Sequence, residues 1–143
     1  MSKPHILLAD DHPQMLANLC RLADKAGEVV GAVTDGRAAV DASRRLHPDV
    51  VVLDLVMPRV GGLDAARAIR RDLPDCRVVV CTVHANENTR DEAFAAGAVG
   101  FVRKQSAHSD LVPAIHAAWA GETFVSPLLE HNTAPPQKNG DSG

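Results

Sequence analysis

The sequence has few aromatic residues and no excess of positive charge, and each shortage excludes a class of protein. Aromatic residues make up 3% of the 143 residues, with one Trp and no Tyr, which leaves little material for stacking on single-stranded nucleic acid. Fifteen Lys and Arg stand against 18 Asp and Glu, a formal net charge of -3 that is opposite in sign to a DNA-binding surface. We therefore expect no DNA binding by this chain alone.

Cysteines are few and long apolar runs are missing. Cys20, Cys76 and Cys81 are odd in number and form no C-x-x-C pair, so reduced, buried thiols are expected rather than disulfides or a zinc site. The first apolar run, residues 6–9, is too short for a signal peptide, and no stretch approaches the ~18 apolar residues of a membrane span. We expect a cytoplasmic protein that does not insert into a membrane.

Five short apolar runs alternate with segments of helical periodicity. The runs, at residues 6–9, 29–33, 50–53, 78–81 and 99–102, are mostly continuous and rich in Val, as in strands buried on both faces of a parallel sheet. Between them, apolar residues recur at helical spacing, for example over residues 16–23, 63–73 and 111–118. This order predicts an α/β, flavodoxin-like fold: a doubly wound five-stranded parallel sheet of (βα)5 topology.

Local signals mark where the helices begin and end. Asp35 and Ser106 can cap helix starts, Gly97 and Gly121 can follow helix ends, and Pro74 stops the third helix. We expect one domain over residues 1–127, closed by a short segment at 122–127. Residues 128–143, rich in Pro, Gly and polar residues, are expected to form a linker or disordered tail.

Polar residues follow the strands at the edge where a doubly wound sheet binds its ligand. They are Asp10 and Asp11 after the first strand, Asp54 after the third, Thr82 after the fourth and Lys104 after the fifth. Three carboxylates in one crevice repel one another, and a divalent cation such as Mg²⁺ relieves that repulsion. The sequence therefore predicts a Mg²⁺ site.

Each of these residues also has an ordinary structural interpretation. Asp10 and Asp11 could cap the next helix, Thr82 could be an ordinary hydroxyl at a strand end, and Lys104 could be a solvated surface charge. Capping cannot explain Asp54, because residues 55–62 separate it from the next helix. An anionic group on Asp54, held by the Lys104 ammonium and the Thr82 hydroxyl, fits phosphoryl transfer to a carboxylate with an acyl phosphate as product.

Together these motifs resemble the receiver domain of bacterial two-component response regulators. The resemblance is carried by Asp10-Asp11, by D-L-V-M-P at residues 54–58 with G-G-L at 61–63, by Thr82, and by G-F-V-R-K at 100–104. The stretch at residues 114–127 further resembles the NarL/FixJ branch, in which a linker and a helix-turn-helix output domain follow the receiver.

The resemblance implies a role for each site residue. Asp54 would be the phosphoacceptor, and Mg²⁺ would be bound by Asp10, Asp11, Asp54 and the backbone carbonyl of Val56, with Asp11 and Asp54 as the more direct ligands. Lys104 would hold a phosphoryl oxygen.

Two further roles concern switching and phosphoryl lifetime. Thr82 would be the switch hydroxyl and Phe101 the switch aromatic, often Tyr in the family, so no signal carried by a hydroxyl is expected at that position. Val56 and His84 lie where the family tunes the access of hydrolytic water. His84 would order that water or merely cover the site.

The resemblance also implies the function and partners. The chain would accept a phosphoryl group on Asp54 from a histidine kinase or phosphotransfer protein and change conformation to control an output domain or partner. It would not be an enzyme, although it would contribute to its own Mg²⁺-dependent phosphorylation and dephosphorylation. We expect no helix-turn-helix output domain within these 143 residues, and a homodimer formed through the first and fifth helices.

Two other classes remain as alternatives. A Mg²⁺-dependent aspartyl phosphohydrolase usually has a second Asp two residues after its nucleophile, where this chain has Val56. A flavin- or nucleotide-binding module would carry a glycine-rich phosphate loop after the first strand, and none is present. His12 adjoins the acid pair, but Mg²⁺ prefers oxygen ligands, so we do not expect it to bind that ion. The histidines at positions 5, 47, 108, 116 and 131 show no metal-binding spacing.

Overall fold

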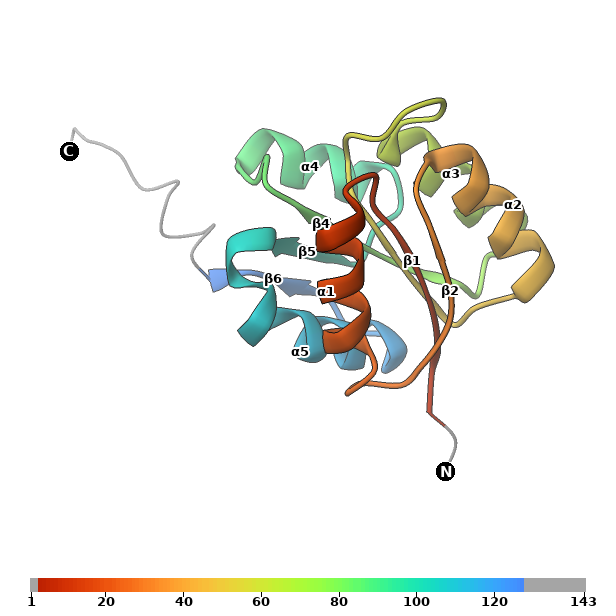
Figure 1. Cartoon of the computed structure of the whole chain (residues 1–143). Helices are drawn as coiled ribbons and strands as arrows, with labels where there is room; N and C mark the ends of the chain where they lie inside the picture. The colour runs from red at the N-terminus through yellow and green to blue at the C-terminus, as the bar shows by residue number, and fades with distance from the viewer. Residues whose placement is uncertain (1–2, 128–143) are drawn as a thin grey trace.

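Strands and helices alternate along residues 3–127, which are the residues that the computed structural model describes. In chain order the elements are β1 (His5–Ala9), α1 (Pro13–Ala23), β2 (Glu28–Val33), α2 (Gly36–Leu46), β3 (Val50–Leu53), α3 (Gly62–Asp72), β4 (Arg77–Thr82), α4 (Glu87–Ala95), β5 (Gly100–Arg103), the 3₁₀ turn η1 (Lys104–Ser106), α5 (Ala107–Trp119) and β6 (Phe124–Val125). The predicted α/β alternation is confirmed (Figure 1).

The sheet is parallel throughout, with the strand order β2-β1-β3-β4-β5-β6. It has six strands rather than the predicted five, because the segment after α5 returns along the otherwise unpaired edge of β5. There the amide of Phe124 donates to the carbonyl of Val99 at 3.0 Å, and the amide of Ser126 donates to the carbonyl of Phe101 at 2.9 Å. A two-residue strand is too short to show a periodicity in the sequence.

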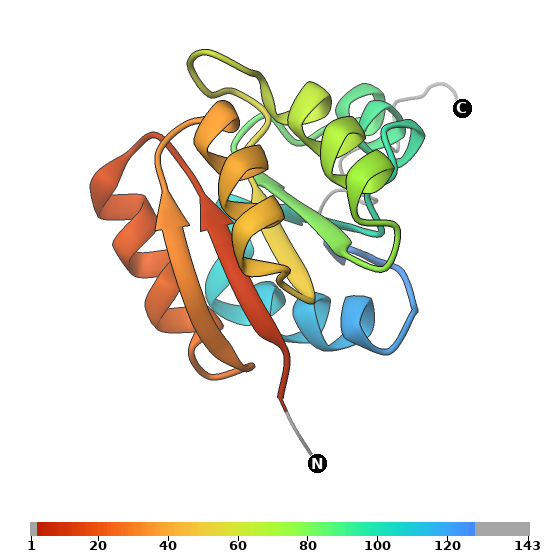
Figure 2. The ribbon, with the colours of Figure 1, turned by 90° about the vertical axis from the view of Figure 1, so that its right-hand side faces the viewer.

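Helices cover both faces of the sheet. Helices α1 and α5 lie on one face, and α2, α3 and α4 lie on the other (Figures 1 and 2). Along β3, Val50 and Val52 pack into the core beneath α1 and α5, whereas Val51 and Leu53 pack into the opposite core. Burial of both faces explains why β3 is a continuous apolar run, as predicted.

The edge strand β2 departs from the predicted burial. None of its six residues is fully buried, because it has a neighbouring strand on one side only. Its apolar side chains still reach the cores, since Val29 packs with the α1 and α5 layer and Val33 packs with the other. The prediction of a strand is therefore confirmed there, and the prediction of burial on both faces is wrong.

Most of the predicted helix boundaries are confirmed. The Asp35 carboxylate accepts a hydrogen bond from the amide of Ala38 at 2.7 Å and so caps α2. Gly97 (φ 104°) and Gly121 (φ 82°) follow α4 and α5 in the left-handed region that favours glycine. Ser106 does stand at the start of α5, but its side chain makes no capping hydrogen bond, so the predicted side-chain cap is wrong.

The predicted linker or tail, residues 128–143, lies outside the described residues. Within residues 3–127, none of the helices is both long and apolar enough to span a bilayer.

Candidate functional site

The predicted site residues come together at the carboxyl ends of four adjacent strands. Asp10 follows β1, Asp54 follows β3, Thr82 ends β4, and Lys104 follows β5. All four are buried, with exposed fractions between 0% and 8%, although they are polar. Polar side chains buried at this edge need partners close by, so their mutual contacts define the site.

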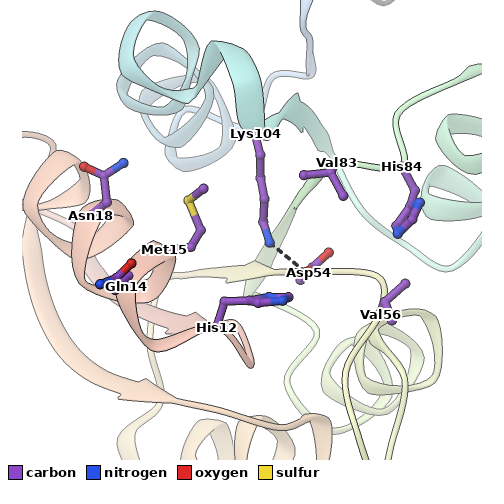
Figure 3. Close-up of a pocket in the computed structure, with 9 residues that line it drawn as sticks. All are labelled: His12, Gln14, Met15, Asn18, Asp54, Val56, Val83, His84 and Lys104. Atoms are coloured by element: carbon purple, nitrogen blue, oxygen red, sulfur yellow. Dashed lines mark hydrogen bonds and ion pairs between the residues drawn. The ribbon is translucent and has the colours of Figure 1, made fainter.

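Lys104 joins two of the carboxylates. Its Nζ lies 2.8 Å from Oδ2 of Asp54 and 2.6 Å from Oδ2 of Asp10 (Figure 3 shows the contact with Asp54). Burial disfavours the charged form of Lys104, but the hydrogen bonds to Asp10 and Asp54 outweigh that effect and raise its pKa. Lys104 is thus a charged group at neutral pH, and it lies between two strand ends.

The acidic cluster offers donor atoms for a cation. Asp10, Asp11, His12 and Asp54 each have a ligand atom, and these atoms lie within 4.8 Å of one another. Oδ1 of Asp54 is buried and has neither a hydrogen bond nor an ion pair among the described residues. A buried carboxylate oxygen without a partner is costly, and a hard divalent cation would satisfy it.

The capping interpretation of the Asp10-Asp11 pair is wrong. His12 occupies the cap position of α1, and no side chain caps that helix. Oδ1 of Asp10 instead accepts a hydrogen bond from the amide of His12 at 2.9 Å, in a turn ahead of the helix. Asp11, which belongs to the acidic cluster, is partly exposed. Neither carboxylate is therefore used to cap α1.

Thr82 and Phe101 lie on neighbouring strands behind the carboxylates. The Thr82 hydroxyl oxygen accepts a hydrogen bond from the amide of His84 at 3.1 Å, and the Thr82 side chain is fully buried. Phe101 is also fully buried, in the core that contains α4. The aromatic ring is therefore already packed inward in this conformation.

A cleft of about 520 Å³ opens over Asp54 and Lys104. Its walls include Met15 of α1, together with Val56 and Val83, whose side chains are largely exposed (Figure 3). The side chains of Gln14, Asn18, His12 and His84 complete the lining. Of these residues, the sequence interpretation missed Gln14, Met15, Asn18 and Val83, although their place directly after the acid pair and after Thr82 could have indicated them.

The loop between β3 and α3 holds the backbone close to Asp54. The amide of Gly62 donates to the carbonyl of Leu55 at 2.9 Å, and a Cβ atom on Gly62 would lie 2.1 Å from the carbonyl oxygen of Asp54. Only glycine fits this approach, so Gly62, the second glycine of the pair noted in the sequence, allows the loop to fold against the site.

The chain matches a known protein family. The sequence profile of the response regulator receiver domain matches residues 6–116. Response regulator GacA of Pseudomonas aeruginosa is 37% identical over 131 residues, which are 90% of this chain and 61% of GacA. The chain thus spans less than two thirds of the length of this relative.

Solved structures agree with the sequence match. A LuxR-family two-component response regulator from Aurantimonas sp. SI85-9A1 superimposes with a TM-score of 0.86 at 36% identity, covering 91% of this chain and 94% of that one. The signal receiver domain of the putative response regulator NarL from Mycobacterium tuberculosis gives a TM-score of 0.80 at 31% identity, covering 85% and 100%. Neither the phosphohydrolase nor the flavin-module alternative fits these matches. The chain belongs to the receiver-domain family of two-component response regulators, signalling domains rather than enzymes with turnover, and to its NarL/FixJ-like branch.

Proposed function

We propose that residues 1–127 are a receiver domain in which Asp54 accepts the phosphoryl group. The observation that carries the proposal is the arrangement around this carboxylate: Lys104 on Oδ2, an unpartnered and buried Oδ1, and an open cleft above both. The ammonium marks where an anionic oxygen can dock, and a carboxylate oxygen of Asp54 supplies the attacking electron pair.

The transfer is a displacement at phosphorus. A carboxylate oxygen of Asp54 forms the new O–P bond while the P–N bond of a phosphohistidine breaks. The electron pair of that bond returns to the imidazole nitrogen of the donor, which takes up a proton from the solvent. Lys104 stabilises the negative charge on the equatorial oxygens, and it can follow them because its contact with Asp10 does not depend on Asp54.

The donor atoms fit Mg²⁺. Three carboxylates from Asp10, Asp11 and Asp54 supply the oxygen ligands that this ion prefers, and the orphaned Oδ1 of Asp54 lacks only a cation. The backbone carbonyl of Val56 would complete the protein ligands. When bound, the ion neutralises charge on the phosphoryl oxygens.

Mass spectrometry of the intact protein tests the assignment. Incubation with Mg²⁺ and a small acyl phosphate should add one phosphoryl group, and chelation of Mg²⁺ should prevent it. Asp54→Asn should abolish the adduct. Asp64→Asn, the same change at an exposed position of α3, should not. An adduct that persists in Asp54→Asn would refute the proposal.

Asp11 provides a separate test of the ion. Asp11→Ala should weaken Mg²⁺ binding, although it removes one member of a repelling cluster and so can leave the protein without Mg²⁺ more stable. Unfolding midpoints with and without Mg²⁺ measure both effects. An unchanged Mg²⁺ response in Asp11→Ala would remove Asp11 from the ligand set.

Hydrogen bonds lead from Thr82 to α4 and support a role for Thr82 as the switch. The amide of His84 donates to the Thr82 hydroxyl oxygen, and the carbonyl of His84 accepts from the Thr89 hydroxyl at 2.6 Å. Thr89 also forms a reciprocal capping box with Asn86 at the start of α4. If the Thr82 hydroxyl turns toward a phosphoryl oxygen, it loses the bond to His84 and loosens this loop.

Phe101 would respond by repacking inside the core, because it is already fully buried. A phosphorylated Thr82→Ala variant should lack the amide shifts across residues 85–120 that the wild type shows. The full set of shifts in that variant would exclude the coupling.

The side chains of Val56 and His84 line the cleft over Asp54, which supports a role in tuning the lifetime of the phosphoryl group. Val56 is apolar and 57% exposed, so it can exclude water, whereas an imidazole at position 84 can order it. The hydrolysis rates of phosphorylated Val56→Asn and His84→Ala, compared with that of the wild type, measure the two contributions.

A histidine kinase or phosphotransfer protein is the proposed donor, and an output domain or partner is the proposed target. The net charge of -3 argues against DNA binding by these residues themselves. A homodimer would use α1 and α5, whose outer faces include the partly exposed Trp119. Sedimentation with and without a phosphoryl mimic, beside a gel-shift assay, tests both. A strict monomer in both states would exclude the dimer, and sequence-selective DNA binding would contradict the charge argument.

A further inference from the structure

A histidine imidazole stands at the mouth of the acidic cluster. Nδ1 of His12 lies 3.1 Å from Oδ1 of Asp11 and 3.4 Å from Oδ1 of Asp10. In Figure 3 the ring lies below Asp54 and extends in the direction of Val56, and His12 is one of the residues that line the cleft. The ring makes no other polar contact with the part of the chain that the structure describes, and its side chain is 72% exposed.

These separations match those between two ligands of one metal ion. At metal–ligand distances of ~2.1 Å, neighbouring ligands are about 3.0 Å apart in octahedral geometry and about 3.4 Å apart in tetrahedral geometry. Nδ1 of His12 therefore already lies at ligand spacing from two carboxylate oxygens.

A second observation points to an ion rather than to a plain ion pair. Oδ1 of Asp54 is buried and has no hydrogen-bond partner among residues 3–127, and Asp54 belongs to the same group of potential metal ligands as His12. The interaction of His12 with the other two carboxylates leaves this oxygen unsatisfied. A cation inside the group would satisfy it.

The donor set of three carboxylates and one imidazole nitrogen suits ions other than Mg²⁺. Mg²⁺ is a hard ion that prefers oxygen and retains water, so an imidazole adds little to its binding. Ni²⁺ and Zn²⁺ bind imidazole well, and their affinity for a mixed nitrogen and oxygen site exceeds that of the harder ions. The imidazole should therefore raise the affinity of the site for Ni²⁺ and Zn²⁺ far more than its affinity for Mg²⁺.

We propose that His12 is a metal ligand for imidazole-preferring divalent ions such as Ni²⁺ and Zn²⁺, which bind together with Asp10, Asp11 and Asp54. The inference rests on the proposed metal site and adds to it a ligand of different chemistry. Because the carboxylates are shared, these ions compete with Mg²⁺. An ion bound through His12 also brings the imidazole over Asp54, where a phosphoryl group would dock.

Isothermal titration with Ni²⁺ and with Mg²⁺ tests the proposal. Ni²⁺ affinity should fall at least about tenfold in His12→Ala, whereas Mg²⁺ affinity should stay within about twofold. His116→Ala, the same change at an exposed position of α5, controls for nickel bound at other histidines. Excess Mg²⁺ should displace the His12-dependent nickel and no other.

A spectroscopic readout identifies the ligand directly. Ni²⁺ is paramagnetic, so an imidazole bound through Nδ1 gives a strongly shifted, solvent-exchangeable proton resonance from its other ring nitrogen. The wild type and His116→Ala should show this resonance, and His12→Ala should not. His12→Asn repeats the test with a residue that favours the cap position of α1, which separates loss of the ligand from loss of the helix start.

Each outcome has one meaning. Equal Ni²⁺ affinity in the wild type and in His12→Ala, or a shifted resonance that persists in His12→Ala and His12→Asn, overturns the inference and leaves the phosphoacceptor role of Asp54 untouched. A loss of Ni²⁺ affinity only in the His12 variants supports it, even if no phosphoryl adduct forms on Asp54.

Discussion

Replacing Lys104 with Met should expose the repulsion that the ammonium now offsets. The side chains of Lys104, Asp10 and Asp54 are only 4%, 1% and 5% exposed, so water screens their charges little. Lys104→Met keeps the length of the apolar stem and removes only the charge. Both buried carboxylates then lose their cation, with no described residue placed to replace it.

The expected cost follows from this burial. Removing one partner of a buried ion pair typically costs ~3–5 kcal/mol, and the open cleft above Asp54 admits water that reduces the penalty. We expect about 3 kcal/mol without Mg²⁺, a loss of roughly 10 °C in Tm for a domain of this size. Mg²⁺ should restore more stability in the variant than in the wild type, because it is then the only cation among three carboxylates.

Urea unfolding with and without Mg²⁺ measures both effects. Lys25→Met, at an exposed turn, is the matched control and should change stability by less than about 0.5 kcal/mol. A Lys104→Met variant as stable as the wild type without Mg²⁺, with the same gain on adding Mg²⁺, would refute the electrostatic argument.

The pKa of Lys104 gives the same experiment a pH dependence. Because the folded pKa is raised above its ordinary value of 10.5, the contribution of Lys104 is complete below pH 10.5. It is lost as the pH rises through the folded pKa. On the alkaline side, the difference in unfolding free energy between the wild type and Lys104→Met should therefore shrink only above pH 10.5, and a difference that shrinks between pH 6 and 9 would contradict this origin.

Three other substitutions or reagents test the surrounding structure. Gly62→Ala places a Cβ against the carbonyl of Asp54, so it should lower the free energy of unfolding by about 2 kcal/mol or more and weaken Mg²⁺ binding. No change in unfolding free energy or in Mg²⁺ affinity would show that the loop accommodates the extra atom easily. Burial raises the pKa of the Cys81 thiol to about 12, so a thiol reagent at pH 8 should label the half-buried Cys20 first. The reagent should reach Cys81 only on unfolding, and peptide mass mapping shows which cysteine is labelled. Ser126→Ala removes a fully buried hydroxyl that donates a hydrogen bond to a carboxylate on α5. The substitution should lower the free energy of unfolding by about 1–2 kcal/mol and speed amide exchange in β6. Unchanged exchange would mean that backbone pairing alone holds that strand.

The sequence was most informative where one physical requirement decides the residue type. Val50–Leu53 must be apolar at every position because both faces of β3 are covered, and Asp54 follows where the strand leaves the core. An aspartate in that place cannot be explained by packing. The position of the site at this edge could therefore be predicted before the fold was known.

Features that depend on tertiary neighbours were not predictable in this way. The strand β6 exists because β5 has a free edge, and a two-residue run carries no pattern. Ser106 had the right residue type for a helix cap, but its side chain makes no such bond. The Lys104 ammonium bridges two carboxylates that are 44 residues apart in the chain, a geometry that no local pattern encodes.

That shared ammonium links the fold to the proposed chemistry through charge. Three carboxylates and one ammonium leave two negative charges in a largely buried site, which a divalent cation cancels. Phosphorylation of Asp54 would convert its carboxylate, with one negative charge, into an acyl phosphate with about two, so the total would change by only about one unit. Lys104 would have to leave Oδ2 of Asp54 for a phosphoryl oxygen, and its 2.6 Å contact with Asp10 can hold it at the site during that exchange. Asp10 is the most buried of the three carboxylates, and this burial suits its role, because Asp10 would hold the Lys104 ammonium in place while Asp54 reacts.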